Sequence, residues 1–162
     1  MRWTSLLLVF TLPALAGMSE SEQKECVELR RTPQRVLDGM YAAGRVGKIP
    51  VGETRGCVVG LPDFAFNEAT ADFMNFFWRG KVFDPNGHDV VNHLWNGYDV
   101  KAEVFVADSW LDGRNAIIID YRHTSLWFWT IRDEIREIRP GLYLGRMYKR
   151  GGGLTLNFAL FQ

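Results

Sequence analysis

Turn dipeptides punctuate the second half of the chain at short intervals. They are Asn86-Gly87, Asn96-Gly97, Asp112-Gly113 and Pro140-Gly141, and the run Gly151-Gly152-Gly153 follows them. Asn-Gly and Asp-Gly supply the positive φ angles that tight hairpins need, and segments rich in Val, Ile, Trp, Tyr and Phe lie between these turns. Repeated hairpins build an antiparallel meander, and a long meander closes into a barrel or folds into a sandwich.

The segments between the turns predict the strands, at residues 54–61, 80–84, 88–95, 98–110, 115–122, 130–138, 142–149 and 154–161. In segment 98–110 apolar and charged residues alternate, as they do in a strand with one face in the interior. Aromatic residues make up 14% of the chain, which favours a β-rich core or a ring-lined cavity. We therefore predict a mainly β fold, an antiparallel up-and-down barrel of about eight strands that is either filled or holds one small ligand, with a β-sandwich as the alternative.

An N-terminal helical arm is expected before the strands. Residues 21–31 contain many helix formers. Thr32 is the predicted N-cap of a second helix over residues 33–43, with Pro33 at its first helical position. A further short helix is predicted over residues 67–77.

Residues 1–16 have the features of a secretory signal peptide. Arg2 gives a positively charged start, residues 6–16 are apolar but too short to span a bilayer, and Ala14-Leu15-Ala16 fits a cleavage site. We expect cleavage after this site, a secreted protein without an integral membrane segment, and a single domain over residues 17–162.

The chain contains two cysteines, Cys26 and Cys57. In an oxidising compartment such a pair is more often bridged than free. We predict a disulfide that joins the N-terminal arm to the first strand, with a stabilisation of ~3 to 4 kcal/mol.

Charge and motifs argue against several functional classes. Lys plus Arg and Asp plus Glu number 19 each, so the neutral chain gives no electrostatic reason to expect nucleic acid as a partner. No His-x-His, Cys-x-x-Cys or His-Glu-x-x-His motif occurs, and no Gly-x-Ser-x-Gly nucleophile motif. No metal site and no cofactor are expected.

The segment 130–137 holds the densest charge cluster of the chain. On a strand, Arg132, Glu134 and Arg136 point to the same side. We interpret them as a solvated outer face with weak cross-strand ion pairs.

Asp133 lies on the other face of this predicted strand. It alternates with Ile131 and Ile135, so its side chain should point inward, where a buried carboxylate needs a partner. Arg146, in the next predicted strand, is the expected partner. The pair is either structural or forms the bottom of a binding pocket.

The strand over residues 115–122 ends in polar residues. Neighbouring residues on a strand face opposite sides, so either Asp120 or Tyr121 enters the interior. Tyr121 is cheaper to bury and offers a hydroxyl to a ligand. His123 lies at the strand end, where barrel mouths place binding residues, although a lone His there is more often a surface residue than a base.

Two further candidate sites lie in segments rich in aromatic residues. Trp78 and Phe83 are expected in the core, and Lys81 between them either stays in solvent or reaches into a cavity to meet an acidic ligand. Trp127-Phe128-Trp129 lies between two predicted strands, where large rings either cap a barrel end or form an exposed patch for a ligand or lipid.

With these residues in view, the chain resembles the lipocalin-like, or calycin, group: a small secreted protein with an N-terminal helical arm, an up-and-down set of strands and an aromatic interior. It departs from true lipocalins in its first strand, where Thr54-Arg55-Gly56-Cys57-Val58-Val59 lacks their Gly-x-Trp. The stretch Trp78-Arg79-Gly80-Lys81-Val82-Phe83 is similar to the Trp-x-Gly-Lys-x-Phe of small proteins with a Gly-x-Trp-x-Gly domain. Both resemblances imply a barrel with a cavity, and neither implies a reaction.

Two main functions follow from these features. The first is a secreted binding protein for a small hydrophobic ligand, which can carry an acidic group, in the barrel cavity. The alternative is a cofactor-free enzyme, an isomerase, cyclase or decarboxylase, in the same cavity; a structural protein with a filled barrel is a third reading. The candidate catalytic residues are Asp133, Asp120, His123 and Tyr121, and the candidate ligand-binding residues are Arg146, Lys81, Trp78, Tyr143, Trp127 and Trp129.

Overall fold

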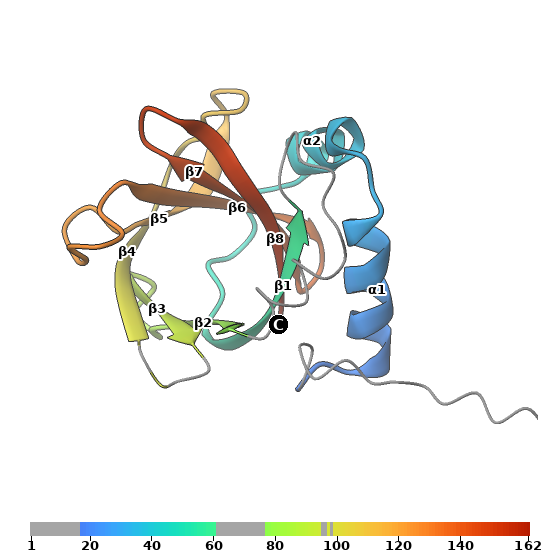
Figure 1. Ribbon diagram of the computed structural model, residues 1–162, viewed down its shortest axis with the longest axis horizontal. Coiled ribbons are helices and arrows are strands. Elements are labelled where there is room, and N and C mark those ends of the chain that lie inside the picture. Colours follow the sequence, from blue (N-terminus) through green and yellow to red (C-terminus); the bar gives the residue numbers. More distant parts are fainter. Residues whose placement is uncertain (1–16, 61–76, 95–96, 98) are drawn as a thin grey trace, which may run out of the picture.

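The protein forms a closed, antiparallel, up-and-down barrel of eight strands (Figure 1). The computed structural model describes residues 17–60, 77–94, 97 and 99–162. The strands are β1 (Gly52–Gly60), β2 (Trp78–Phe83), β3 (Asp89–Leu94), β4 (Asp99–Asp108), β5 (Asn115–Asp120), β6 (Ile131–Arg139), β7 (Leu142–Lys149) and β8 (Gly153–Phe161). Each strand pairs with its neighbours in sequence, and β1 pairs with β8. This last pairing closes the sheet, so the predicted barrel is confirmed and the sandwich is wrong.

Glycines with positive φ form the hairpin turns, as the dipeptides predicted. Gly87, Gly97, Gly113 and Gly141 have φ angles of 70°, 71°, 68° and 75°. An L residue with a side chain rarely adopts this region, whereas glycine enters it without a steric penalty. Short, local turns therefore set the order of β2 to β5 and of β6 to β8.

Helix α1 (Glu20–Arg30) begins with a capping box. The Glu22 backbone N–H donates to Ser19 Oγ at 3.3 Å, and the Ser19 N–H donates to Glu22 Oε2 at 2.7 Å. Two backbone donors that the helix leaves unpaired are thereby satisfied. Cys26 and Leu29 form the buried side of this helix.

Helix α2 (Gln34–Ala43) begins one residue later than predicted. Pro33 is its N-cap, with extended backbone and no side-chain capping bond. Thr32 is not the N-cap, because its hydroxyl donates to the Glu28 carbonyl in the last turn of α1 at 2.9 Å. Leu37 and Tyr41 are the buried residues of α2.

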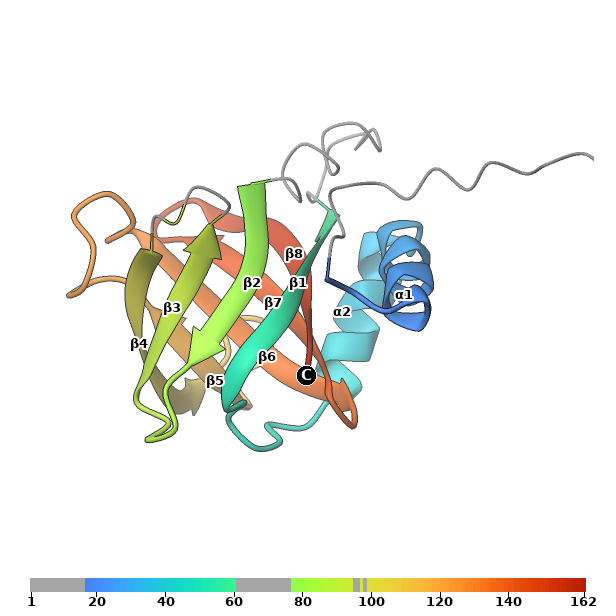
Figure 2. The ribbon, with the colours of Figure 1, turned by 90° about the horizontal axis from the view of Figure 1, so that it is seen from below.

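The two helices cover part of the outer wall of the barrel (Figure 2). Helix α1 packs on β1, and α2 packs on β6 and β7. The described residues consequently form two cores, one inside the barrel and one between the barrel and the helices. The buried residues of the hydrophobic cluster inside the barrel are Phe83, Val90, Val100, Ala102, Val104, Ile117, Ile119, Tyr121, Ile135, Tyr143, Phe158 and Leu160. The outer core contains Met18, Cys26, Leu29, Leu37, Tyr41, Cys57, Val59, Ala116, Ile118, Leu142, Leu144, Ala159 and Phe161.

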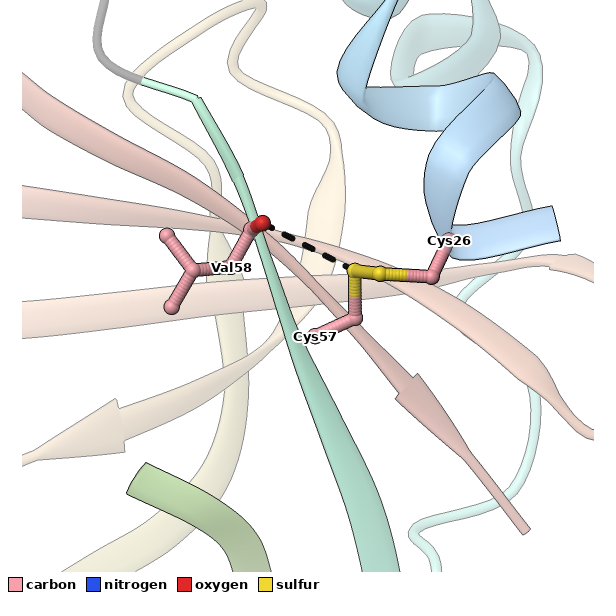
Figure 3. The surroundings of a disulfide bond; sticks show 3 residues. All are labelled: Cys26, Cys57 and Val58. Atoms are coloured by element: carbon pink, nitrogen blue, oxygen red, sulfur yellow. Dashed lines mark hydrogen bonds between the residues drawn. A yellow bond between two sulfur atoms is a disulfide. The ribbon is translucent and has the colours of Figure 1, made fainter. Parts of the chain in front are cut away.

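The disulfide between Cys26 and Cys57 lies in the outer core and joins α1 to β1 (Figure 3). Both cysteines are fully buried, and the predicted pairing is confirmed. Among the described residues, no helix has the length and apolarity to cross a membrane.

The charged outer face of β6 is buried, and its prediction as a solvated face is wrong. Glu134 is 0% exposed and Arg136 is 1% exposed, because α2 and the β4–β5 turn cover this face. Arg136 donates to both carboxylate oxygens of Asp112, at 2.8 and 2.7 Å, and to the Tyr41 carbonyl at 3.3 Å. Glu134 accepts from the Ser109 hydroxyl at 2.6 Å. Buried charges of this kind are tolerated because each is paired and hydrogen-bonded.

Two predicted segments lie almost entirely outside the described residues. The signal peptide at residues 1–16 lies outside the described residues, as does the short helix predicted over residues 67–77, apart from Phe77. Cleavage of the signal peptide, and a single domain after it, stay predictions.

Candidate functional site

The barrel contains a cavity of about 240 Å³. It lies toward the end of the barrel where β2 begins and β3 ends, which is the upper end in Figure 2. Its described lining residues are Val58, Trp78, Lys81, Asn92, Leu94, Val100, Tyr121, Phe128, Ile131, Asp133, Met147, Leu156 and Phe158. Apolar side chains form most of this lining, and four polar side chains interrupt it.

The four polar residues form one hydrogen-bonded group, called here the polar tetrad: Lys81, Asn92, Tyr121 and Asp133. Lys81 Nζ lies 2.8 Å from Asp133 Oδ2, 2.7 Å from Tyr121 OH and 2.7 Å from Asn92 Oδ1. The Tyr121 hydroxyl donates to Asp133 Oδ2 at 3.1 Å, and Asn92 Nδ2 donates to the Tyr121 oxygen at 2.7 Å. The tetrad joins β2, β3, β6 and the end of β5 across the barrel interior.

A tight approach of β1 and β2 places Lys81 and Trp78 at the cavity. The pairing of β2 with β3 shifts by one residue between Trp78 and Gly80. Gly80 has a φ of 135°, and a Cβ there would lie 2.0 Å from the Thr54 carbonyl oxygen. A Cβ on Gly56 would lie 2.8 Å from the Trp78 ring. Only glycine fits at these two positions, and the Trp78 ring occupies the space beside Gly56.

Aromatic rings surround the Lys81 ammonium. Its Nζ lies 5.7 Å from the ring centroid of Trp78 and 5.4 Å from those of Tyr121 and Phe158. The negative faces of such rings attract a cation. The rings and the Asp133 carboxylate together explain how a lysine that is 2% exposed keeps favourable contacts away from water.

Asp133 points inward, as the alternation of β6 predicted. It pairs in register with Ile119 on β5 and Met147 on β7, and it is 3% exposed. The prediction that Arg146 is its partner is wrong, because Arg146 pairs in register with Glu134 and therefore faces outward. There Arg146 forms an ion pair with Asp38 of α2. The partner of Asp133 is Lys81, on a strand that is not adjacent to β6.

Tyr121 is the polar group at the end of β5 that enters the interior, and Asp120 faces outward. Burial and the neighbouring Asp133 carboxylate raise the pKa of Tyr121 well above its ordinary value, so the hydroxyl keeps its proton. Asp120 accepts from Arg150 Nη2 at 2.6 Å outside the cavity. His123 is exposed in the β5–β6 connection. The structure therefore separates Asp120 and His123 from Asp133 and Tyr121.

The aromatic residues of the β5–β6 connection divide between the surface and the cavity. Trp127 and Trp129 are 83% and 57% exposed and are not among the cavity-lining residues. Phe128 lines the cavity. Tyr143 is buried inside the barrel, but its hydroxyl donates to the Lys48 carbonyl at 2.9 Å and it does not line the cavity.

Sequence reasoning missed Asn92 and Phe158 as site residues, and it named Phe128 only as part of the aromatic run at residues 127–129. Asn92 alternates with Val90 and Leu94 on β3, and a polar residue at an apolar alternation position is the signal that would have found it. Phe158 lies on the same face of β8 as Leu156, so alternation could have placed both in the interior. Phe128 lies in a connection between strands, so alternation could not distinguish it from its neighbours Trp127 and Trp129.

The polar tetrad leaves one acceptor without a partner. Asp133 Oδ1 is buried and receives no hydrogen bond from the described residues. Carboxylate oxygens have several acceptor positions, and a buried oxygen without a donor costs free energy. Among the described residues, no group of three His, Cys, Asp or Glu side chains is placed to hold a metal ion. The site can thus accept a hydrogen bond in a largely apolar space.

The comparisons with known proteins place the fold and nothing finer. No protein-family model and no curated protein matches the sequence. A crystal structure of a protein from Thermomonospora curvata is similar, with a TM-score of 0.57 over 88% of this chain and 96% of that one. The identity is 16%, so the likeness concerns the fold alone.

Proposed function

We propose that the protein is a secreted binding protein for a small hydrophobic ligand, held in the barrel cavity in the manner of the lipocalin-like group. The apolar cavity with its buried polar tetrad is the observation that carries this proposal. Small-molecule sites are typically concave and apolar, with a few polar groups that fix the orientation of the ligand. The disulfide and the predicted signal peptide are compatible with an extracytoplasmic protein.

The size of the cavity limits the ligand. A volume of about 240 Å³ is below the roughly 300 to 1,000 Å³ of pockets that hold drug-sized molecules. A short aliphatic chain or one to two fused rings suits this space. The rings of Trp78 and Phe158 contact each other edge to face, with centroids 5.5 Å apart. Both rings line the cavity and offer apolar surfaces to such a molecule.

An enzyme is the second candidate, because Asp133 and Tyr121 share the cavity. A proton-transfer enzyme needs a base and a separate donor that stabilises developing negative charge. Asp133 lines the cavity and is the candidate base. The Tyr121 hydroxyl, however, donates to Asp133 Oδ2, so the base already occupies the donor that would have to stabilise the negative charge. Binding is therefore the better supported function.

A fluorescence titration tests the proposal, since Trp78 lies on the cavity wall. Saturable quenching of tryptophan emission by small apolar alcohols, phenols or hydrocarbons is expected for the wild-type protein. Val100→Phe fills the cavity and should abolish the response. Val82→Phe is the matched control, because Val82 lies on β2 outside the barrel, partly exposed, and should bind as the wild type does. No saturable response to any compound would contradict the proposal.

The enzyme reading has a separate test. Each ligand that binds is incubated with the protein in heavy water and then analysed by nuclear magnetic resonance. Deuterium that enters the ligand at carbon with the wild type, but not with Asp133→Asn, would make the protein an enzyme. An unchanged ligand supports binding alone.

A further inference from the structure

The donors of Lys81 are all engaged within the polar tetrad. An ammonium group has three N–H donors, and Lys81 directs them to Asp133 Oδ2, Tyr121 OH and Asn92 Oδ1. A ligand carboxylate would have to displace one of these partners to reach Lys81. Lys81 therefore has no unused N–H donor with which to bind an acidic ligand.

The Tyr121 hydroxyl is engaged in the same way. A phenol has one donor and two acceptor positions. The oxygen accepts from Lys81 and from Asn92, and the proton goes to Asp133 Oδ2. The indole N–H of Trp78 is also used, since it donates to Asn92 Oδ1 at 3.1 Å.

Asp133 differs from Lys81 and Tyr121, because one of its oxygens is an acceptor without a hydrogen bond from the described part of the chain. Oδ2 accepts from Lys81 and Tyr121, whereas the buried Oδ1 receives no hydrogen bond from the described residues. The group that complements this site is a donor on the ligand. A hydrogen bond to a charged acceptor is stronger than one between neutral groups.

The charges of the tetrad already balance. The Lys81 ammonium and the Asp133 carboxylate form an ion pair at 2.8 Å, and Asn92 and Tyr121 are neutral. A ligand with a net charge would add an uncompensated charge to a low-dielectric cavity, which is costly. Neutral ligands avoid this cost.

We infer that the cavity selects neutral apolar molecules with a hydroxyl or N–H donor, such as alcohols and phenols, and rejects carboxylic acids. The donor binds the Asp133 carboxylate, and the apolar part lies against the rings of Trp78 and Phe158, which line the cavity with it. This inference rests on the proposed function and specifies the ligand of the same cavity.

A series of ligands with one alkyl chain and four head groups tests it. Octanol, methyl octyl ether, octanoate and octylammonium are titrated at neutral pH by calorimetry and by tryptophan quenching. Octanol should bind at least about tenfold more tightly than each of the others. The ether keeps the oxygen but loses the donor, the octanoate adds a second carboxylate, and the octylammonium keeps donors but adds a charge.

A pair of variants locates the selectivity. In Asp133→Asn the preference for octanol over octanoate should shrink, because the free acceptor loses its charge. Asp120→Asn removes a carboxylate outside the cavity and should leave the ranking unchanged. If Asp133→Asn does not fold, the four-ligand series on the wild-type protein still tests the inference.

The outcomes separate the inference from the proposed function. Equal or tighter binding of the ether, the octanoate or the octylammonium overturns the inference and leaves a hydrophobic binding protein. Binding of none of the four compounds overturns both.

Discussion

The Lys81 ammonium and the Asp133 carboxylate meet at 2.8 Å inside the barrel, although the two residues are 52 positions apart in the chain. They belong to β2 and β6, which are not adjacent in the sheet. The pair therefore connects separate parts of the barrel wall through the interior. It also provides the only charges among the described lining residues of the cavity.

Replacing Lys81 by Met should strongly destabilise the protein. The substitution leaves the Asp133 carboxylate buried without its cation, a change that typically costs about 3 to 5 kcal/mol. Urea denaturation followed by circular dichroism measures the loss. The double variant Lys81→Met, Asp133→Leu should recover part of it, because it removes both charges.

The exposed pair of Lys101 and Asp89 is the matched control, with a distance of 2.9 Å. Lys101→Met should change the free energy of unfolding far less, because solvent screens this pair. Equal losses for Lys81→Met and Lys101→Met would show that burial of the tetrad pair has no energetic consequence.

Gly145→Ala should reduce the cavity and weaken ligand binding. A Cβ on Gly145 would lie 2.3 Å from two carbons of the Phe158 ring, so the ring has to move, and Phe158 lines the cavity. Overpacking of this kind costs about 1 to 3 kcal/mol of stability. Thermal unfolding and the octanol titration measure the two effects.

Gly39→Ala is the control for this substitution, because a Cβ on Gly39 meets no atom within 4 Å. Gly39 lies within α2, where alanine is the better helix former. The control should be as stable as the wild type or more stable, with unchanged octanol affinity. A Gly145→Ala protein that binds octanol like the wild type would refute the placement of Phe158 on the cavity wall.

Removal of the disulfide should loosen α1 before it affects the barrel. The bond closes a segment with a sequence separation of 31, and its loss in Cys26→Ala, Cys57→Ala should lower the free energy of unfolding by about 3 to 4 kcal/mol. Hydrogen exchange should accelerate in α1, while β4 and β5 keep their protection. Equal acceleration in α1 and the strands would show that the bond supports the whole barrel.

Asp112 should make stability depend on acid pH. Its hydrogen bonds from Arg136, and then from Arg114, hold its pKa well below the ordinary Asp value. A carboxyl whose pKa is lower in the folded state stabilises the fold above its unfolded pKa of about 3.9. This contribution disappears as the pH falls below that value toward the folded pKa.

The free energy of unfolding, measured in urea across this acid range, should therefore fall with decreasing pH. Asp112→Asn should be less stable than the wild type near neutral pH, and its pH dependence should be shallower. Parallel curves for the two proteins would show that the Asp112–Arg136 contact does not contribute through its charge.

Local sequence patterns determined much of this protein. The turn dipeptides predicted the hairpins, because glycine is the residue that enters positive φ without strain. The alternation of β6 predicted that Asp133 points inward, and the cost of burying a carboxylate favoured Tyr121 over Asp120 for the interior. Each of these rests on a property of one residue and its near neighbours.

Only the tertiary structure decided which side chains meet. Alternation assigns a residue to one face of a strand, but barrel closure brings β2 across from β6, so Asp133 binds Lys81 and not Arg146. The docking of α2 buries Glu134 and Arg136, whose strand pattern by itself is that of a solvated face. Contacts between distant segments depend on register, closure and helix packing together, and no short stretch of sequence contains that information.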